Sequence, residues 1–168
     1  LTHEIYRDVP ARLVRLARPD DIILGPIVEA FQNPGWYLLD GVGIGSHGAV
    51  ETVKLFFNKD GLTPYNVKTI KVDSDSITSQ ALLRILLLCH YERAPASLAF
   101  VKTHSRPEAF LKIGDKAWDF SEQPALDLGQ AWTQWTGLPF VYACWMTRSQ
   151  AVGQKLKKVL LTQAQKNL

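Results

Sequence analysis

The feature that most constrains this chain is the alternation of short apolar runs with amphipathic stretches along its length. Apolar runs of about four to eight residues bounded by Gly or Pro are typical of buried strands, whereas apolar residues at helical spacing are typical of helices. Because the two patterns take turns along the chain, we predict an α/β fold. With 168 residues, 46% of them apolar, the chain is long enough for one large core or two small ones.

The pattern assigns elements to most of the chain. The predicted strands lie at residues 3–7, 21–24, 37–39, 49–57, 68–72, 97–101, 110–113 and 140–145. The predicted helices lie at residues 11–17, 27–32, 80–91, 128–136 and 152–165. The apolar run at 21–24 is expected to be a buried strand of the parallel type.

The glycine-rich segment at residues 41–48 is not a phosphate loop. It lacks the Gly-Lys-Ser/Thr ending of a Walker motif, and it precedes a predicted strand instead of opening a helix. Glycine allows close approach of the backbone to other groups. We therefore expect a turn here, close to a ligand or to a neighbouring lobe.

The βα units fall into two groups, which two strand-like crossings near residues 49–57 and 138–146 connect. This is the wiring of a two-lobed, hinge-closing binding protein, in which a ligand lies against the carboxyl ends of strands and the N-termini of helices. The predicted domains are lobe I, residues 1–54 with 139–168, and lobe II, residues 55–138.

The segment Ser74-Asp75-Ser76-Ile77-Thr78-Ser79 lies between a predicted strand and a long helix. Hydroxyl groups beside the free amides of a helix N-terminus favour an anion there. Ser, Thr and Asp are also the preferred N-cap residues, so capping alone is the simpler explanation. Three hydroxyls and one carboxylate exceed what a cap requires, and both interpretations stay open.

We predict no metal site. The four histidines are far apart in the sequence: His3, His47, His90 and His104. Only His47 lies in the glycine-rich segment, where a solvated loop residue is the simpler interpretation. Cys89 and Cys144 lie in apolar runs without metal-ligand spacing, which favours two buried thiols over a metal site or a disulfide.

The charge of the chain indicates small partners. Its net charge is +3, and its basic residues are scattered except near residues 155–158, so we expect no nucleic-acid partner. A small positive charge suits a small anionic substrate. Without a signal-peptide pattern or an apolar run long enough to span a membrane, we expect a cytoplasmic protein with no membrane partner.

Several segments carry a resemblance to one known family. They are Val9 to Leu13, Leu24-Gly25-Pro26 to Phe31, Val42 to Val50, Ser76 to Ser79 with Leu82 to Leu87, Ile113-Gly114-Asp115-Lys116-Ala117, and Asp127-Leu128-Gly129 to Val141. The last segment is the most specific, because Asp-Leu-Gly, Trp and Thr-Gly-Leu-Pro-Phe follow one another in a long and unusual order. From about residue 8 to 147 the chain resembles the chorismate dehydratases of the futalosine route to menaquinone.

The resemblance implies a fold similar to that of type II periplasmic binding proteins. It also implies removal of water from chorismate, giving 3-[(1-carboxyvinyl)oxy]benzoate, without a metal or an organic cofactor. Loss of the ring hydrogen builds charge onto the ring carboxylate, so donors that grip this group stabilise the transition state more than the ground state. The enolpyruvyl carboxylate of the substrate is a candidate for the base.

The resemblance also implies site residues. Thr52, in Gly48-Ala49-Val50-Glu51-Thr52, stands where the family has its active-site Ser, and we assign it the catalytic role. Ile77 stands where the family often has Arg. The implied substrate-binding residues are Ser76, Thr78, Ser79, Gly25, Pro26, Gly114 and Asp115.

The chain also departs from the family pattern. It starts beyond the opening strand and its Asn loop, and the family's further C-terminal helices are missing, so we expect an incomplete lobe I. Such a lobe exposes apolar surface, which predicts either self-association or packing of residues 150–168 into the vacancy. The alternative function is a non-catalytic module that binds small carboxylates. The sister enzyme that makes dihydroxynaphthoate fits the segment Trp135 to Phe140 less well.

Overall fold

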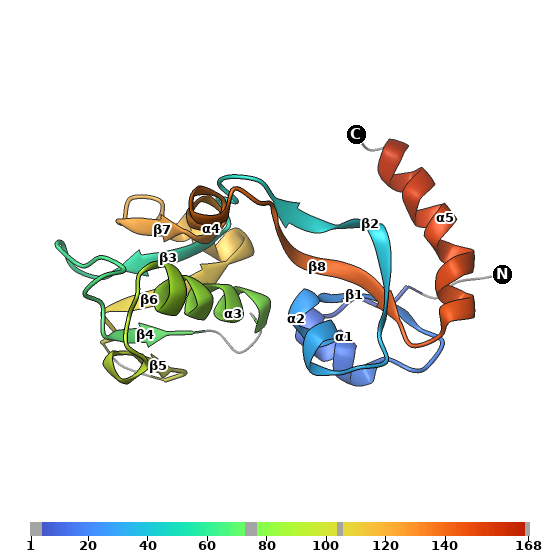
Figure 1. Cartoon of the computed structure of the whole chain (residues 1–168), viewed down its shortest axis with the longest axis horizontal. Helices are drawn as coiled ribbons and strands as arrows, with labels where there is room; N and C mark the ends of the chain where they lie inside the picture. Colours follow the sequence, from blue (N-terminus) through green and yellow to red (C-terminus); the bar gives the residue numbers. More distant parts are fainter. Residues whose placement is uncertain (1–4, 73–76, 104–105, 167–168) are drawn as a thin grey trace. The chain divides into compact units, whose positions relative to one another are not determined.

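The computed structural model describes residues 5–72, 77–103 and 106–166, and it confirms an α/β protein (Figure 1). The chain divides into two compact units, unit 1 with Leu1–Ile44 and Val141–Leu168, and unit 2 with Gly45–Phe140. The predicted boundary between residues 54 and 55 would cut the strand Val53–Phe57. This strand lies wholly in unit 2, because both of its pairing partners belong to that unit.

Unit 1 is built on a three-stranded sheet in the order β1-β8-β2. Its strands are β1 Ile22–Pro26, β2 Tyr37–Ser46 and β8 Phe140–Thr147. Its helices are α1 Pro10–Leu16, α2 Ile27–Gln32 and α5 Gln150–Lys166. β1 runs antiparallel to β8, so the predicted parallel orientation is wrong. An apolar run reports burial on both faces, and it carries no information on the direction of the neighbouring strand.

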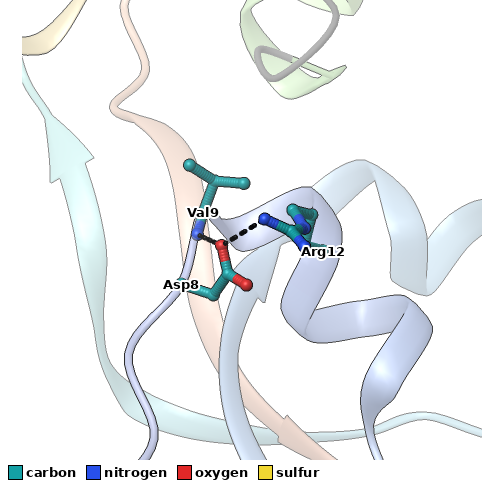
Figure 2. A network of polar contacts seen from close by, with 3 residues as sticks. All are labelled: Asp8, Val9 and Arg12. Atoms are coloured by element: carbon teal, nitrogen blue, oxygen red, sulfur yellow. Dashed lines mark hydrogen bonds and ion pairs between the residues drawn. The ribbon is translucent and has the colours of Figure 1, made fainter.

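Helix α1 begins at Pro10, whose ring fixes the helical φ at a position where no N–H is needed. The carboxylate of Asp8 accepts a hydrogen bond from the Val9 amide at 2.7 Å, and Arg12 Nη1 lies 3.6 Å from the same oxygen (Figure 2). The Arg12 side chain is exposed, so this ion pair contributes about 0–1 kcal/mol. Its main effect is to fix the start of the helix.

A small cluster of buried residues forms the core of unit 1: Ile23, Trp36, Cys144 and Met146. Partly buried side chains from α1, α2 and the segment after α1 pack against it, among them Leu13, Val14 and Ile27. The guanidinium of Arg148 lies 4.2 Å over the Trp36 ring, which is cation–π geometry. One layer of side chains therefore holds the sheet of unit 1 to its two short helices.

The glycine-rich segment continues β2 as far as Ser46, so the predicted turn at 41–48 is wrong over most of its length. A Cβ atom on Gly43 would lie 2.7 Å from the carbonyl oxygen of Ala143 in β8. The glycine therefore permits close approach of two neighbouring strands within unit 1. Next to it, the ammonium of Lys157 in α5 forms a hydrogen-bonded ion pair with Asp40, which lowers the pKa of that carboxyl.

Unit 2 contains a five-stranded sheet in the order β5-β4-β6-β3-β7. Its strands are β3 Val53–Phe57, β4 Thr69–Lys71, β5 Ala99–Val101, β6 Ala109–Ile113 and β7 Ala125–Asp127. Its α-helices are α3 Ile77–Ile85, which continues as a π-helical turn Leu86–His90, and α4 Leu128–Thr136. The sheet is mixed, since β4 is parallel to β5 and β6 whereas β3 is antiparallel to β6 and β7.

Alternation along β3 sends side chains to both faces of this sheet. Leu55 is completely buried, and α4 packs against β3 and α3. Phe56 points to the other face, where its ring lies 5.5 Å from the rings of both Phe110 and Phe120. Each such side chain contributes roughly 1.5–3 kcal/mol through burial. Side chains therefore cover both faces of the sheet of unit 2.

Several predicted elements are confirmed closely. The helices at 27–32 and 128–136 have the predicted bounds, and the tail helix is confirmed as α5. Of the strand predicted at 3–7, the described residues 5–7 have no regular structure. The sequence analysis missed β7 and the 3₁₀ helix Gly114–Phe120, which are short and lack a periodic pattern.

Candidate functional site

One edge of the sheet in unit 2 brings together three of the predicted site residues, Thr52, Gly114 and Asp115. The parallel strands β4 and β6 both end at this edge, and β3 begins there because it runs antiparallel to β6 (Figure 1). β7 also ends there, and α4 begins directly after it. Thr52 precedes β3, Gly114 and Asp115 follow β6, and the segment after β4 leads into α3. Main-chain direction therefore brings Thr52 close to Gly114 and Asp115.

Thr52 and Gly114 are in direct contact. The amide of Gly114 donates to the carbonyl oxygen of Thr52 at 2.8 Å, and the neighbouring pair Val53 and Ile113 continues the ladder. Gly114 has a φ of +62°, in the left-handed region where glycine is unstrained. Asp115 comes next and is exposed. The structure therefore brings together Thr52, Gly114 and Asp115 of the predicted set.

Helix α3, which follows β4 in the chain, carries two of the predicted site residues. It has nine residues and continues without a break into the π-helical turn, and its first turn has no acidic residue. Thr78 and Ser79 are buried, each with 6% of its surface exposed. Among the described residues, Thr78 Oγ1 has no hydrogen-bond partner. A buried hydroxyl without a partner costs about 1–3 kcal/mol, so an oxygen that bonds to it would be stabilised.

Simple capping does not explain this hydroxyl. Thr78 lies inside the first turn of α3 and not at the position before the helix, where an N-cap side chain would lie. Ser76, which the sequence also assigned to the site, lies outside the described residues. The anion-site interpretation of this segment therefore depends on Thr78, Ser79 and the helix amides.

The carboxylate of Asp127 links the segment before Thr52 to the start of α4. Asp127 was not predicted as a site residue. Its Oδ1 accepts from the Gln130 amide at 3.0 Å, as an N-cap does, and from the Val50 amide at 3.1 Å. Its Oδ2 accepts from the Glu51 amide at 2.7 Å. An Asp three residues before Gln130 at a helix start is a recognisable cap. Nothing in the local sequence indicates its other partners, Val50 and Glu51, which lie 77 and 76 residues earlier in the chain.

The backbone between these contacts is strained. Glu51 has a φ of +61°, and the amide of Thr52 donates to the Val50 carbonyl at 2.7 Å. A hydrogen bond over two residues with a positive φ at the central residue is the strained form of the γ-turn. The Thr52 hydroxyl also donates to the Val50 carbonyl, at 3.3 Å. The segment before Thr52 is therefore held in a conformation that it would not adopt alone.

The remaining predicted residues lie elsewhere in the chain. Gly25 and Pro26 end β1 in unit 1, where both are buried and paired with β8. His47 is exposed. Cys144 is buried as expected, and burial raises the pKa of its thiol, but Cys89 is exposed, so the prediction of two buried thiols is half wrong. An apolar run on a helix also includes positions that face outward.

Two kinds of feature are absent from the described residues. Residues 5–72, 77–103 and 106–166 contain no group of three or more His, Cys, Asp or Glu side chains placed to hold a metal ion. Within the same ranges, no helix combines the length and apolar character that a membrane crossing requires.

Fold and site together define an α/β protein in which Thr52, Gly114 and Asp115 lie together at one edge of a mixed sheet. Comparison with known families then places it: residues 1–166 match the family model described as menaquinone biosynthesis. The match covers nearly the whole chain, so the chain belongs to this family. Membership indicates a role in menaquinone biosynthesis as a biosynthetic enzyme.

Proposed function

We propose that this protein removes water from chorismate to give 3-[(1-carboxyvinyl)oxy]benzoate. The observation that carries the proposal is the contact of Thr52 with Gly114 at one edge of the sheet in unit 2, and the buried hydroxyl of Thr78 in α3 supports it. Family membership supports the pathway, and the resemblance to chorismate dehydratases supports this particular step.

The reaction needs a group that stabilises negative charge. The ring hydrogen beside the enolpyruvyl ether leaves as a proton, and its electron pair moves through the adjacent double bond toward the ring carboxylate. The electrons then return to the ring as the neighbouring C–O bond breaks. The released hydroxide combines with a proton, so the products are water and an aromatic ring. Donors on the ring carboxylate stabilise the charge that develops in the transition state.

We assign this carboxylate to the α3 end of the site. The amides of the first turn and the hydroxyls of Thr78 and Ser79 are the donors, and the helix dipole adds to their effect. The Thr52 hydroxyl now makes a long bond of 3.3 Å to Val50, and rotation about its C–O bond would direct the hydrogen to a ligand. An ionised Asp side chain has no hydrogen-bond donor for a carboxylate of the substrate. We therefore assign Asp115 to the ring hydroxyl of the substrate, from which it can accept a hydrogen bond.

The scaffold is part of the proposal. We assign unit 1 to lobe I and unit 2 to lobe II of a fold like that of the type II periplasmic binding proteins. The chain passes between the units twice, near residues 44–45 and 140–141, and this wiring supports the assignment. The resemblance also assigns substrate binding to Gly25 and Pro26, which are buried in unit 1 and paired with β8.

Incubation of the purified protein with chorismate tests the proposal. We expect a product with the aromatic absorbance and the mass of the enolpyruvyl benzoate. Replacement of Thr52 by Val removes one hydroxyl at constant shape, and should lower kcat/KM by about tenfold to a thousandfold, the usual range for loss of one such donor. Thr52→Ser keeps the hydroxyl and is the matched control. A folded wild type that binds chorismate without turnover would instead be a binding module, and the proposal would be wrong.

A further inference from the structure

The carboxylate of Asp127 is a meeting point of two segments of unit 2 that are far apart in the sequence. It accepts three backbone amides, from Gln130 in α4 and from Val50 and Glu51 in the segment before β3. Both of its oxygens are used, and hydrogen bonds to an ionised acceptor are stronger than those between neutral groups. Capping of α4 requires only the bond to Gln130, so two of the three bonds need another explanation.

Those two bonds hold the strained turn. The amides that Asp127 accepts belong to Val50 and to Glu51, the central residue of the γ-turn with a φ of +61°. A non-glycine residue keeps such a conformation only when its surroundings impose it. Thr133 adds a further tie, since its hydroxyl accepts the amide of Gly48 at 2.9 Å.

The γ-turn at Glu51 fixes the position of Thr52. Its amide closes the γ-turn on Val50 at 2.7 Å, and its carbonyl accepts the Gly114 amide at 2.8 Å. If Glu51 relaxed to a negative φ, the peptide plane entering Thr52 would rotate and the hydroxyl would point elsewhere. A displacement of about 1 Å at a reacting group can lower a rate about a hundredfold.

We propose that Asp127 is a positioning residue for Thr52, which it orients by imposing the left-handed conformation of Glu51. This inference rests on the proposed function, because Thr52 matters for turnover only if the site acts on chorismate. Asp127 itself need not touch the substrate.

The variant Asp127→Asn separates positioning from helix capping. Asn is as good an N-cap as Asp, so its amide oxygen can still accept from Gln130. One carboxylate oxygen becomes an NH₂ group, which cannot accept the Glu51 amide. We expect a folded protein whose kcat for chorismate falls about tenfold to a hundredfold while KM changes less than about threefold. The control Asp119→Asn changes an exposed Asp of the same unit and should keep the wild-type kcat.

A second substitution provides the decisive readout. Glycine adopts a positive φ without strain, so Glu51→Gly should restore most of the kcat that Asp127→Asn loses. A merely structural role of Asp127 in α4 would not be rescued in this way. Wild-type kcat in Asp127→Asn, or a loss that Glu51→Gly leaves unchanged, would overturn the inference.

Amide hydrogen exchange tests whether Asp127 holds the turn at Glu51, without reference to activity. In Asp127→Asn the Glu51 amide should exchange at least about tenfold faster, while the Gln130 amide stays protected. If the wild type does not convert chorismate, the proposed function is wrong. The exchange rate of the Glu51 amide then still tests whether Asp127 holds the turn. Unchanged exchange at Glu51 would overturn the inference in either case.

Discussion

The two units differ in how completely they bury the side chains of their sheets. In unit 2, nine large side chains are almost completely inaccessible: Phe56, Leu55, Ile70, Leu82, Leu83, Leu86, Leu87, Leu128 and Val67. Among the described residues of unit 1, only Met146 and Thr147 reach this level. Among the described residues, unit 1 also exposes more of its large apolar side chains, with Ile5 at 80%, Phe31 at 79% and Tyr6 at 67%, although unit 2 exposes Tyr65 at 67% and Leu138 at 57%.

This difference indicates which unit can hold a functional side chain in a fixed position. A close-packed interior transmits constraints to the backbone around it, whereas a thin core leaves its surroundings freer. The strained turn at Glu51 lies at the edge of the well-packed sheet of unit 2. Unit 1 has several exposed large apolar side chains among its described residues, and its self-association, or its cover by residues 150–168, stays a prediction.

The largest expected effect is a loss of stability specific to unit 2. Leu82→Ala removes a completely buried side chain from α3 and should lower the free energy of unfolding by about 2–5 kcal/mol. Leu38→Ala in β2 of unit 1 is the matched control, because Leu38 is 44% exposed, and it should cost less than about 1 kcal/mol. Urea denaturation measures both. Equal losses would contradict the complete burial of Leu82.

A smaller effect should separate stability from function at Thr78. Thr78→Val replaces a buried hydroxyl that has no partner among the described residues by a methyl group of the same size. The free energy of unfolding should stay constant or rise, by up to about 1–3 kcal/mol, because the unpaired group is removed. Turnover of chorismate should fall in the same variant. Thr78→Ser is the control, and a clear loss of stability in Thr78→Val would mean that the hydroxyl has a partner after all.

The smallest effect concerns the two thiols, one in each unit. Cys89 is exposed whereas Cys144 is buried, and burial raises the pKa of the Cys144 thiol. Iodoacetamide should therefore label Cys89 first, and Cys144 only as unit 1 opens. Peptide mass spectrometry measures both rates.

The raised pKa of Cys144 also sets a pH dependence. This contribution to stability is fully present below the pKa of the unfolded thiol, about 8.5, and is lost as the pH rises through the higher folded pKa. Thermal unfolding of wild type and Cys144→Ala between about pH 8 and 10 measures it. A Cys144 that reacts as fast as Cys89 at neutral pH would contradict the description of the unit 1 core.

Much of the fold could be predicted from the sequence, because the spacing of apolar residues indicates which positions are buried. The run from Leu128 to Thr136 has helical spacing and a glycine directly after it, and the helix has these bounds. Periodicity does not report strand direction, so β1 was wrongly expected to be parallel. It also failed for the glycine-rich part of β2, where glycine serves the contact of Gly43 with Ala143 and not a turn.

The site could be predicted only in part, for a related reason. Thr52, Gly114 and Asp115 follow from the family motifs and lie together in the structure. Asp127 resembles an ordinary helix cap in the sequence, and its tie to Val50 and Glu51 depends on how β3 and β7 pair. Interactions between segments far apart in the chain appear only when the sheet has been assembled.

Titration of ¹⁵N-labelled protein with chorismate tests the central claim most directly, namely that the ligand binds at the α3 edge of the sheet in unit 2. We expect the largest amide shifts at Thr52, Thr78, Ser79 and Gly114, with smaller shifts at Glu51. Unit 2 also has a shallow hollow of about 280 Å³ at the opposite edge, lined by Phe57 to Asp60 and Glu122 to Pro124. Shifts confined to that hollow, or to no residue of unit 2, would contradict the account.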